Sequence, residues 1–298
     1  MSFPDVPGNS PIIATPFTPD GAVDYDSLRS ELRFIADTGC QAATLFGIAS
    51  EFYKLSDAER TRLVEVTTEV SDEVGLSPVI SVTHESTVMA VEDAAAYENA
   101  GAECIMVFPP RFGNPPKQKI LDHVRAIADT VDVPIMVQHT PMNVAVSPAE
   151  WAGVYEEFPN VRYFKIEVDN PGQYIADLFD EADEDIVALV GSAGVQMIEG
   201  YDRGARGVMP AAVYEEFYNA IHEAYVGGDR ERAVEMHTDL LGVLNAFRGI
   251  DSSKYLLAER GIIESPHCRE PTSGIGDSVN EDLHLEVHDR MMGLIEAL

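Results

Sequence analysis

The sequence has few basic residues and few cysteines. Its 298 residues include 20 lysines and arginines against 51 aspartates and glutamates, for a formal net charge of −31. A charge of this sign repels nucleic acid and anionic membrane surfaces, so we expect neither as a partner. The three cysteines, Cys40, Cys104 and Cys268, have no metal-ligand spacing, and their odd number favours reduced thiols in a cytosol over a disulfide framework.

Membrane spans, export signals and cofactor motifs are also missing. No stretch approaches the roughly 18 apolar residues of a membrane span, and residues 1–10 lack the basic and apolar regions of a signal peptide. We therefore expect a cytoplasmic protein. Without a glycine-rich phosphate loop, a nucleotide fingerprint or zinc-ligand spacing, the sequence predicts chemistry that needs no cofactor or metal. His284 and His288 lie one helical turn apart, but no third ligand is apparent, which favours an amphipathic surface over a metal site.

Hydrophobic residues make up 45% of the chain and recur with regular periods, so we expect a folded protein and not an acidic tail. The acidic excess suits a halophilic protein, because screening to a Debye length of roughly 3 Å at 1 M salt removes much of the self-repulsion. An anionic substrate would then need locally arranged donors, since the overall field does not attract it.

Apolar periodicity predicts an α/β protein in which strand-like runs alternate with helix-like stretches. Eight such alternations are typical of a (β/α)8 TIM barrel. Residues 1–225 are predicted to form this barrel, and residues 226–298 a C-terminal helical layer packed on it. The expected strands span residues 11–17, 42–47, 78–84, 103–109, 134–140, 161–168, 186–192 and 206–211, and the expected late helices residues 229–247, 251–261 and 281–297.

Helix-start patterns agree with this segmentation. Segments 56–59, 147–150 and 170–173 each begin with Ser or Asn and end with Glu or Gln, and two of them place proline at the first helical position. We therefore expect capped helices to begin after the second, fifth and sixth strands.

Lys165 is one of only five lysines in the chain, and it lies inside the apolar run 161–168. Strand alternation places Tyr163, Lys165 and Glu167 on one face and Phe164, Ile166 and Val168 on the other. In an apolar interior the charged form of an amine is disfavoured. The neutral amine is the nucleophile that imine formation with a ketone requires. A structural ion pair between Lys165 and Glu167 is the alternative interpretation.

Polar groups follow several of the predicted strands. In barrels of this kind the working residues lie at the carboxyl ends of the strands, so we expect these groups to converge on one rim. Ser50 and the turn that begins at Gly47 can aim donors at a carboxylate, although the same turn is as well explained as a tight strand-to-helix connection. The expected rim residues are Ala49, Ser50, His84, Arg111, Phe112, Gln138, His139, Lys165, Glu167, Gly191, Ser192 and Met209.

Across nearly its whole length the chain resembles the dihydrodipicolinate synthase and N-acetylneuraminate lyase superfamily of Schiff-base enzymes. The motifs are Thr15-Pro-Phe17, the Gly47 turn with Glu51, Pro109-Pro110 and Phe164-Lys165. The resemblance implies that Lys165 forms an imine with a 2-keto acid, that Ala49 and Ser50 hold the acid's carboxylate, and that the protein is a homo-oligomer.

Several positions depart from the synthase pattern. Gln138 and His139 stand where synthases carry tyrosine and asparagine, Arg111-Phe112 replaces a tyrosine pair, and Asn143 aligns with the arginine that holds a second carboxylate. Within the superfamily the chain looks most like the 2-keto-3-deoxypentonate dehydratases of the L-arabonate type, above all in Tyr163-Phe-Lys-Ile-Glu167.

The chemistry of the residues supports dehydration. Gln138 cannot relay a proton as retro-aldol cleavage requires, whereas Glu167 can remove the C3 proton and then assist loss of the C4 hydroxyl. Gln138 and His139 would orient sugar hydroxyls, with His84, Gly191 and Met209 as further substrate-binding positions.

Three alternatives stay open at this point. The chain could be an aldolase that cleaves a 2-keto-3-deoxy sugar acid to pyruvate and an aldehyde, or a dihydrodipicolinate synthase. In a different class, it could be a non-catalytic barrel that binds 2-keto acids.

Overall fold

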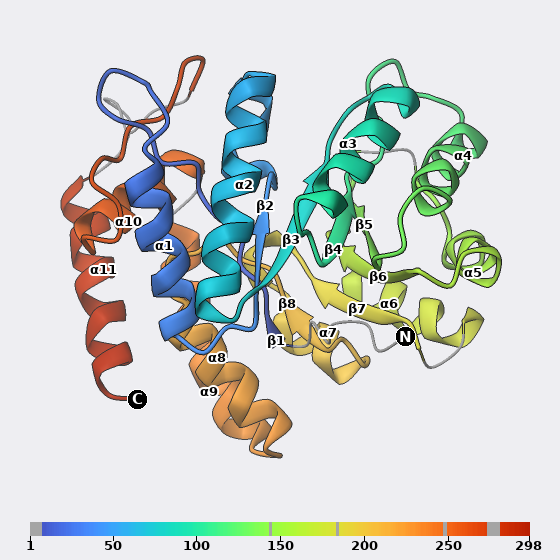
Figure 1. The fold of residues 1–298 in the computed structure, drawn as a ribbon. Helices are drawn as coiled ribbons and strands as arrows, with labels where there is room; N and C mark the ends of the chain where they lie inside the picture. The colour runs from blue at the N-terminus through green and yellow to red at the C-terminus, as the bar shows by residue number, and fades with distance from the viewer. Residues whose placement is uncertain (1–7, 143–144, 183–184, 247–248, 273–280) are drawn as a thin grey trace.

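The chain folds into a closed barrel of parallel strands surrounded by helices (Figure 1). The computed structural model describes residues 8–142, 145–182, 185–246, 249–272 and 281–298. Within these ranges eight parallel strands follow the order β1-β8-β7-β6-β5-β4-β3-β2, and Ile12 bridges both Thr44 and Ala211 to close the barrel. The predicted (β/α)8 fold is therefore confirmed. The strands are β1 (Gly8–Asn9), β2 (Ala42–Leu45), β3 (Ser77–Val82), β4 (Cys104–Val107), β5 (Ile135–His139), β6 (Val161–Ile166), β7 (Val187–Val190) and β8 (Gly207–Val208).

The first strand differs from its prediction at residues 11–17. Regular pairing is confined to Gly8–Asn9, and beyond it the chain pairs irregularly through Ile12. Pro11 lies between these two segments and cannot donate a ladder hydrogen bond, which explains the interruption. Backbone bonds from Ile12 N–H to Pro210 O (2.7 Å) and from Ile13 N–H to Thr44 O (2.9 Å) still join this segment to both neighbours.

The helices follow the strands in the predicted alternation. The predicted capping boxes are present at Ser56 before α2 and at Ser147 before α5. At α6 the predicted start is confirmed, with Asn170 at the N-cap and Pro171 at the first position, but Asn170 makes no side-chain cap bond and Gln173 donates to Asp177. The α-helices are α1 (Tyr25–Asp37), α2 (Asp57–Val74), α3 (Thr87–Asn99), α4 (Lys117–Ala128), α5 (Pro148–Glu157), α6 (Pro171–Glu181), α7 (Met197–Asp202), α8 (Glu215–Val226), α9 (Arg230–Ala246), α10 (Ile250–Glu259) and α11 (Glu281–Glu296), and the 3-10 turns are η1 (Ile48–Ser50), η2 (Phe52–Lys54) and η3 (Ser192–Gly194).

Side-chain alternation along the strands separates two apolar clusters. The larger cluster fills the space between strands and helices and includes Phe164 and Ile166 of β6. The smaller cluster fills the barrel interior and consists of Ile12, Ala42, Val79, Cys104, Met106, Met136, Tyr163, Val187, Leu189 and Met209. Because Tyr163 belongs to the interior cluster, the inward face of β6 is the one on which the sequence places Lys165.

The C-terminal helices lie on the α1 and α8 side of the barrel (Figure 1). α9 packs against α7 and α8, and α11 packs against α8 and α9. His284 and His288, expected on an amphipathic surface, are both buried: His284 bonds Ser252 of α10 at 3.3 Å, and His288 bonds Tyr214 before α8 at 3.0 Å. These contacts fasten α11 to the body of the protein.

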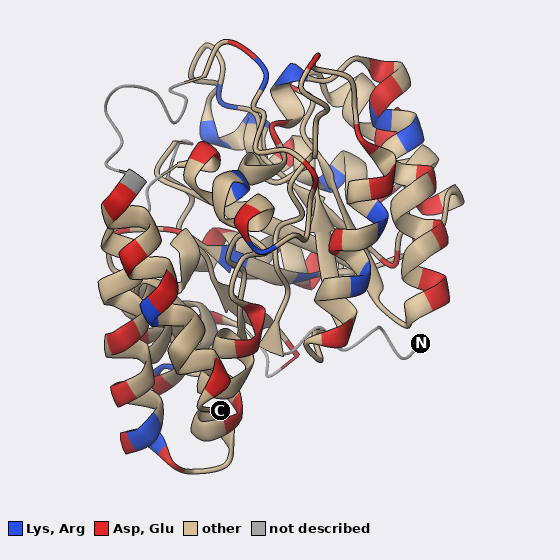
Figure 2. Cartoon of the chain, turned by 90° about the vertical axis from the view of Figure 1, so that its left-hand side faces the viewer, with Lys and Arg blue, Asp and Glu red and all other residues tan. Residues whose placement is uncertain are grey.

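The outer helices carry most of the acidic side chains (Figure 2). In the ranges given above, no helix has both the length and the apolarity that crossing a membrane would require. Cys40, Cys104 and Cys268 are buried free thiols.

Candidate active site

The carboxyl end of β6 carries the two residues singled out by the sequence. Tyr163 belongs to the interior cluster, so alternation directs Lys165 into the barrel as well. Phe164 faces the opposite way and packs against Trp151 of α5. Lys165 is the last but one residue of β6 and is only 3% exposed, and Glu167 follows the strand directly. Both side chains therefore lie inside the barrel, at its carboxyl-terminal end.

The Glu167 carboxylate is held from three sides. Its Oε1 lies 3.3 Å from the Lys165 Nζ and accepts the Ser192 N–H at 3.1 Å. Its Oε2 accepts the Gln138 side-chain N–H at 2.6 Å. Burial alone would raise the pKa of Glu167, but the Lys165 ammonium and the hydrogen bonds from Gln138 and Ser192 outweigh burial and hold this pKa below its ordinary value. Glu167 is thus a carboxylate, ready to accept a proton.

Strand pairing places these partners. Gln138 of β5 is opposite Lys165 of β6 in the parallel register. Gly191, directly after β7, gives Glu167 its space: a β-carbon at Gly191 would lie 2.1 Å from the Glu167 Cγ. The absence of a side chain at Gly191 is therefore a condition for the observed position of the carboxylate.

Glu167 also lines a cavity of about 320 Å³ at this end of the barrel. A substrate in that space would meet the carboxylate directly. The lining residues are Pro141, Ile166, Glu167, Val168, Asp169, Pro171, Val190, Gly191, Ser192, Val195 and Gln196.

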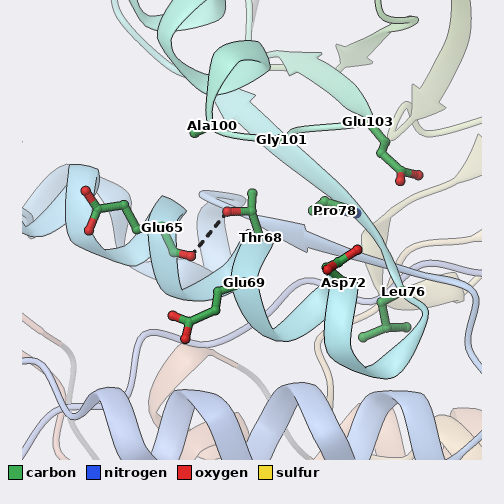
Figure 3. A pocket seen from close by; sticks show the side chains of 9 residues that line it. All are labelled: Glu65, Thr68, Glu69, Asp72, Leu76, Pro78, Ala100, Gly101 and Glu103. Carbon is green, nitrogen blue, oxygen red and sulfur yellow. Dashed lines mark hydrogen bonds between the residues drawn. The ribbon is translucent and has the colours of Figure 1, made fainter.

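A larger hollow of about 640 Å³ lies at the opposite end of the barrel, beside the loops that precede β3 and β4 (Figure 3). Its walls carry Glu65, Glu69, Asp72 and Glu103. Catalytic residues of parallel barrels lie at the carboxyl ends of strands, and Glu167 lines the smaller cavity, so we assign the site to that cavity. Lys165 is not one of the lining residues and is joined to the cavity through its contact with Glu167.

The structure does not bring every predicted rim residue to this centre. Met209 lies in the interior cluster with Tyr163. His139 alternates with the inward-facing Gln138, so it faces outward and stacks on Tyr174 of α6 with ring centroids 4.5 Å apart. Burial lowers the pKa of His139 to about 4, so this histidine is a neutral packing residue behind the barrel wall.

His84 and Arg111 lie together elsewhere on the rim. Both line a cavity of about 470 Å³. His84 Nε2 is 3.8 Å from Asp93, and Arg111 pairs with Glu85 at 3.5 Å. Phe112 is 88% exposed.

The turn after β2 holds Ala49 and Ser50. Ala49 packs against the interior cluster. Ser50 is fully buried, with its N–H donating to Gly47 O at 2.9 Å and its hydroxyl donating to Ile13 O at 2.5 Å. The Ser50 hydroxyl would have to turn away from Ile13 to donate to a substrate. Asn143, the counterpart of the synthase arginine, lies outside the described residues.

Sequence reasoning missed the Ser192 N–H and the cavity residues Asp169 and Gln196. Ser192 is one of the expected rim residues, but the group that contacts Glu167 is its backbone N–H and not its side chain. The run Gly191-Ser-Ala-Gly194 at the end of β7 was the available signal, since two glycines so close together indicate a tight turn, and Ser192 and Ala193 there both have positive φ.

The dihydrodipicolinate synthetase family model matches residues 6–290. A 4-hydroxy-tetrahydrodipicolinate synthase of Haloarcula marismortui is 29% identical over 93% of this chain and 91% of its own length. An L-2-keto-3-deoxyarabonate dehydratase of Azospirillum brasilense is 27% identical over 91% of this chain and 90% of its own length.

Among solved structures, the 4-hydroxy-tetrahydrodipicolinate synthase of Methylacidiphilum fumariolicum SolV matches the fold with a TM-score of 0.90 at 20% identity, over 98% of this chain and 99% of its own. The match of the family model covers almost all of the sequence, and the barrel agrees with it. The chain belongs to the dihydrodipicolinate synthetase family.

Proposed function

We propose that this protein is a Schiff-base lyase that dehydrates a 2-keto-3-deoxypentonate to 2-oxoglutarate semialdehyde. The observation that carries the proposal is the contact between the Lys165 amine and the Glu167 carboxylate at 3.3 Å, inside the barrel and next to a cavity. The resemblance of Tyr163-Phe-Lys-Ile-Glu167 to the pentonate dehydratases and the arabonate dehydratase among the relatives point the same way.

The first step prepares the nucleophile. Lys165 can pass a proton to Glu167 across their contact, which frees the amine to attack C2 of the 2-keto acid. The Glu167 carboxyl group then returns this proton to the C2 hydroxyl of the carbinolamine, which leaves as water. A protonated imine on Lys165 remains, which withdraws electrons from C3, and Glu167 is again a carboxylate. The turn that contains Ala49 and Ser50 would hold the substrate carboxylate.

Glu167 then performs the proton transfers. As a carboxylate it removes a proton from C3, and the electron pair of that bond moves toward the imine to give an enamine. Collapse of the enamine expels the C4 hydroxyl, which takes the proton from the Glu167 carboxyl group and leaves as water. The intermediate now has a C3=C4 double bond and a hydroxyl on C5. Transfer of a hydrogen from C5 to C3 gives an enol, which ketonises to an aldehyde at C5, and hydrolysis of the imine releases the product and restores Lys165.

Gln138 favours dehydration over cleavage. Its amide donates to Glu167 at 2.6 Å and so fixes the carboxylate, but it has no proton to exchange with a substrate hydroxyl. Retro-aldol cleavage needs a base at the C4 hydroxyl, a role that a tyrosine at this position would fill.

Product analysis tests the proposal. Purified protein would be incubated with 2-keto-3-deoxy-arabonate and with 2-keto-3-deoxy-xylonate, and the products separated by mass. We expect 2-oxoglutarate semialdehyde. Pyruvate with glycolaldehyde would establish the aldolase alternative, and turnover of pyruvate with aspartate semialdehyde would establish a synthase. A protein that forms no borohydride-trapped adduct on Lys165 with any 2-keto acid would be a binding barrel at most.

Glu167→Gln separates the two roles within the site. This variant keeps the size of residue 167 but removes its base, and one of the two facing amides must turn so that Gln138 and residue 167 still share a hydrogen bond. We expect a pyruvate adduct on Lys165 that forms more slowly, because Glu167 no longer accepts the Lys165 proton, and dehydration reduced at least about 100-fold. Dehydration at the wild-type rate would contradict the role given to Glu167.

We also infer a homo-oligomer. Four large apolar side chains are exposed near the rim cavity that Tyr53 and Arg111 share: Tyr53 (55%), Val88 (67%), Met89 (41%) and Phe112 (88%). Such a group on an otherwise acidic protein suits contact with a second copy. Light scattering should show a mass above that of one chain, and Phe112→Asp should lower it; a wild-type monomer would contradict the inference.

A further inference from the structure

The turn between β2 and η2 rests on a buried charged cluster that the proposed mechanism does not use. Glu51, which ends η1, is fully buried and has a left-handed backbone with φ 52° and ψ 31°. Left-handed geometry is unfavourable for a residue other than glycine unless its surroundings fix it. Two ammonium groups do so here: Lys54 contacts the Glu51 Oε2 at 2.8 Å, and Lys254 contacts its Oε1.

Lys254 comes from α10, far along the sequence from the turn. Its side chain is fully buried, its Nζ donates to His267 O at 3.1 Å, and it lies 4.1 Å from the centroid of the Phe17 ring. In a chain with five lysines, two serve this single carboxylate. A buried carboxylate that loses a partner is strongly destabilised, so this pairing holds the turn in one position.

Further contacts link the same cluster to Ser50 through the segment 13–17. Thr15 donates from Oγ1 to Ser50 O at 2.5 Å, and the Ser50 hydroxyl donates to Ile13 O. Phe17, two residues beyond Thr15, is covered on its ring by Lys254 and by Arg269, whose Cζ is 4.4 Å from the ring centroid. The segment 13–17 therefore lies between the turn and the C-terminal residues.

We propose that Lys254 is a positioning residue, which acts through Glu51 to fix the turn at Ala49 and Ser50 for the carboxylate of a 2-keto acid. The C-terminal layer thereby completes the substrate site from outside the barrel. This inference rests on the proposed function only in its choice of a 2-keto acid as ligand.

Comparing how two ligands bind distinguishes this positioning role from a general contribution of Lys254 to stability. Pyruvate and hydroxyacetone both present a ketone to Lys165, but only pyruvate carries a carboxylate for the turn. Borohydride trapping at graded ligand concentrations, followed by mass spectrometry of the Lys165 peptide, gives the half-saturating concentration of each. The variants are Lys254→Met, which removes the charge, Lys254→Arg, which restores a cation, and Lys119→Met as a control at a lysine that is 71% exposed.

We expect Lys254→Met to raise the half-saturating pyruvate concentration about 10- to 100-fold, because a misplacement of roughly 1 Å can cost about 100-fold. Hydroxyacetone trapping should change by less than about twofold, and Lys254→Arg should recover part of the loss. Equal losses with both ligands, or no change with pyruvate, would overturn the proposal.

Glu51→Gln covers the case in which Lys254→Met does not fold. This variant keeps the shape of residue 51 and weakens both ion pairs, so it should show the same selective loss with pyruvate. Melting temperature and circular dichroism establish that each variant is folded. If the wild type traps pyruvate but dehydrates no sugar acid, the proposed reaction fails while the role of Lys254 is still tested; if it traps no 2-keto acid, both fail.

Discussion

The glycine beside Glu167 gives the sharpest test of the proposed active site. A β-carbon at Gly191 would lie 2.1 Å from the Glu167 Cγ and 2.7 Å from its Oε1. The φ of Gly191 is −91°, which other residues adopt freely, so Gly191→Ala acts through this collision and not through backbone strain. An ordinary contact begins at 3.4 Å, so the carboxylate must move by more than about 1 Å.

Such a displacement would separate Glu167 from the reacting atoms while leaving Lys165 in place. Because a misplacement of ~1 Å can cost about 100-fold in rate, we expect Gly191→Ala to lower kcat for dehydration by about 100-fold. Borohydride should still trap pyruvate on Lys165, although more slowly, because Glu167 is also the acceptor of the first Lys165 proton. The assay is semialdehyde formation at saturating substrate, with melting temperature as the check on folding.

A double-mutant cycle supplies the control. In a Glu167→Ala background the side chain that the new methyl group strikes is absent, so adding Gly191→Ala should change residual dehydration and imine trapping by less than about twofold. A full additional loss in that background would refute the idea that Gly191 acts by making room for Glu167.

Three further predictions concern pH and salt. Burial raises the pKa of Glu31 to about 8 from 4.5, so the stability that Glu31 contributes is complete below pH 4.5 and is lost as the pH rises through about 8. The melting temperature should fall across that window. Glu31→Gln keeps an acceptor for the Ala14 N–H and should flatten the fall, whereas an unchanged slope would contradict this assignment. Because the Lys165 ammonium and the bonds from Gln138 and Ser192 hold the pKa of Glu167 below its ordinary value, the acid limb of kcat/KM should lie below the pH at which an ordinary glutamate titrates, and a limb above that pH would argue against Glu167 as the base. Raising KCl from about 0.1 M to about 1 M shortens the Debye length from roughly 10 Å to 3 Å, so the melting temperature should rise with salt; a flat or falling curve would count against adaptation to a salty cytosol.

Much of the fold could be predicted from the sequence because apolar periodicity is a local signal. The strands in the middle of the chain, such as 135–139 and 161–166, lie inside their predicted ranges. The first strand was misplaced because periodicity does not show which backbone donors are missing, and Pro11 removes one. At α6, Gln173 donates to Asp177 one turn further on and does not accept the N–H of residue 170, and spacing alone does not decide between these two bonds.

The site was partly predictable for the same reason. Alternation along β6 was sufficient to place Lys165 and Glu167 together, as their 3.3 Å contact shows. The same rule, applied to β5, would have separated Gln138 from His139. The space at Gly191 and the Ser192 donor depend on β7 packing beside β6, which is a long-range contact without a local signature in the sequence.

The distribution of lysines has a practical consequence for attaching the protein to a surface. Lys54, Lys165 and Lys254 are enclosed in ion pairs, whereas the side chains of Lys117 and Lys119 are 44% and 71% exposed. Both exposed amines belong to the first turn of α4, which follows β4 at the carboxyl-terminal end of the barrel. Coupling through lysine amines would therefore turn the mouth of the barrel toward the support and obstruct it, so immobilisation through an added C-terminal tag is the better choice.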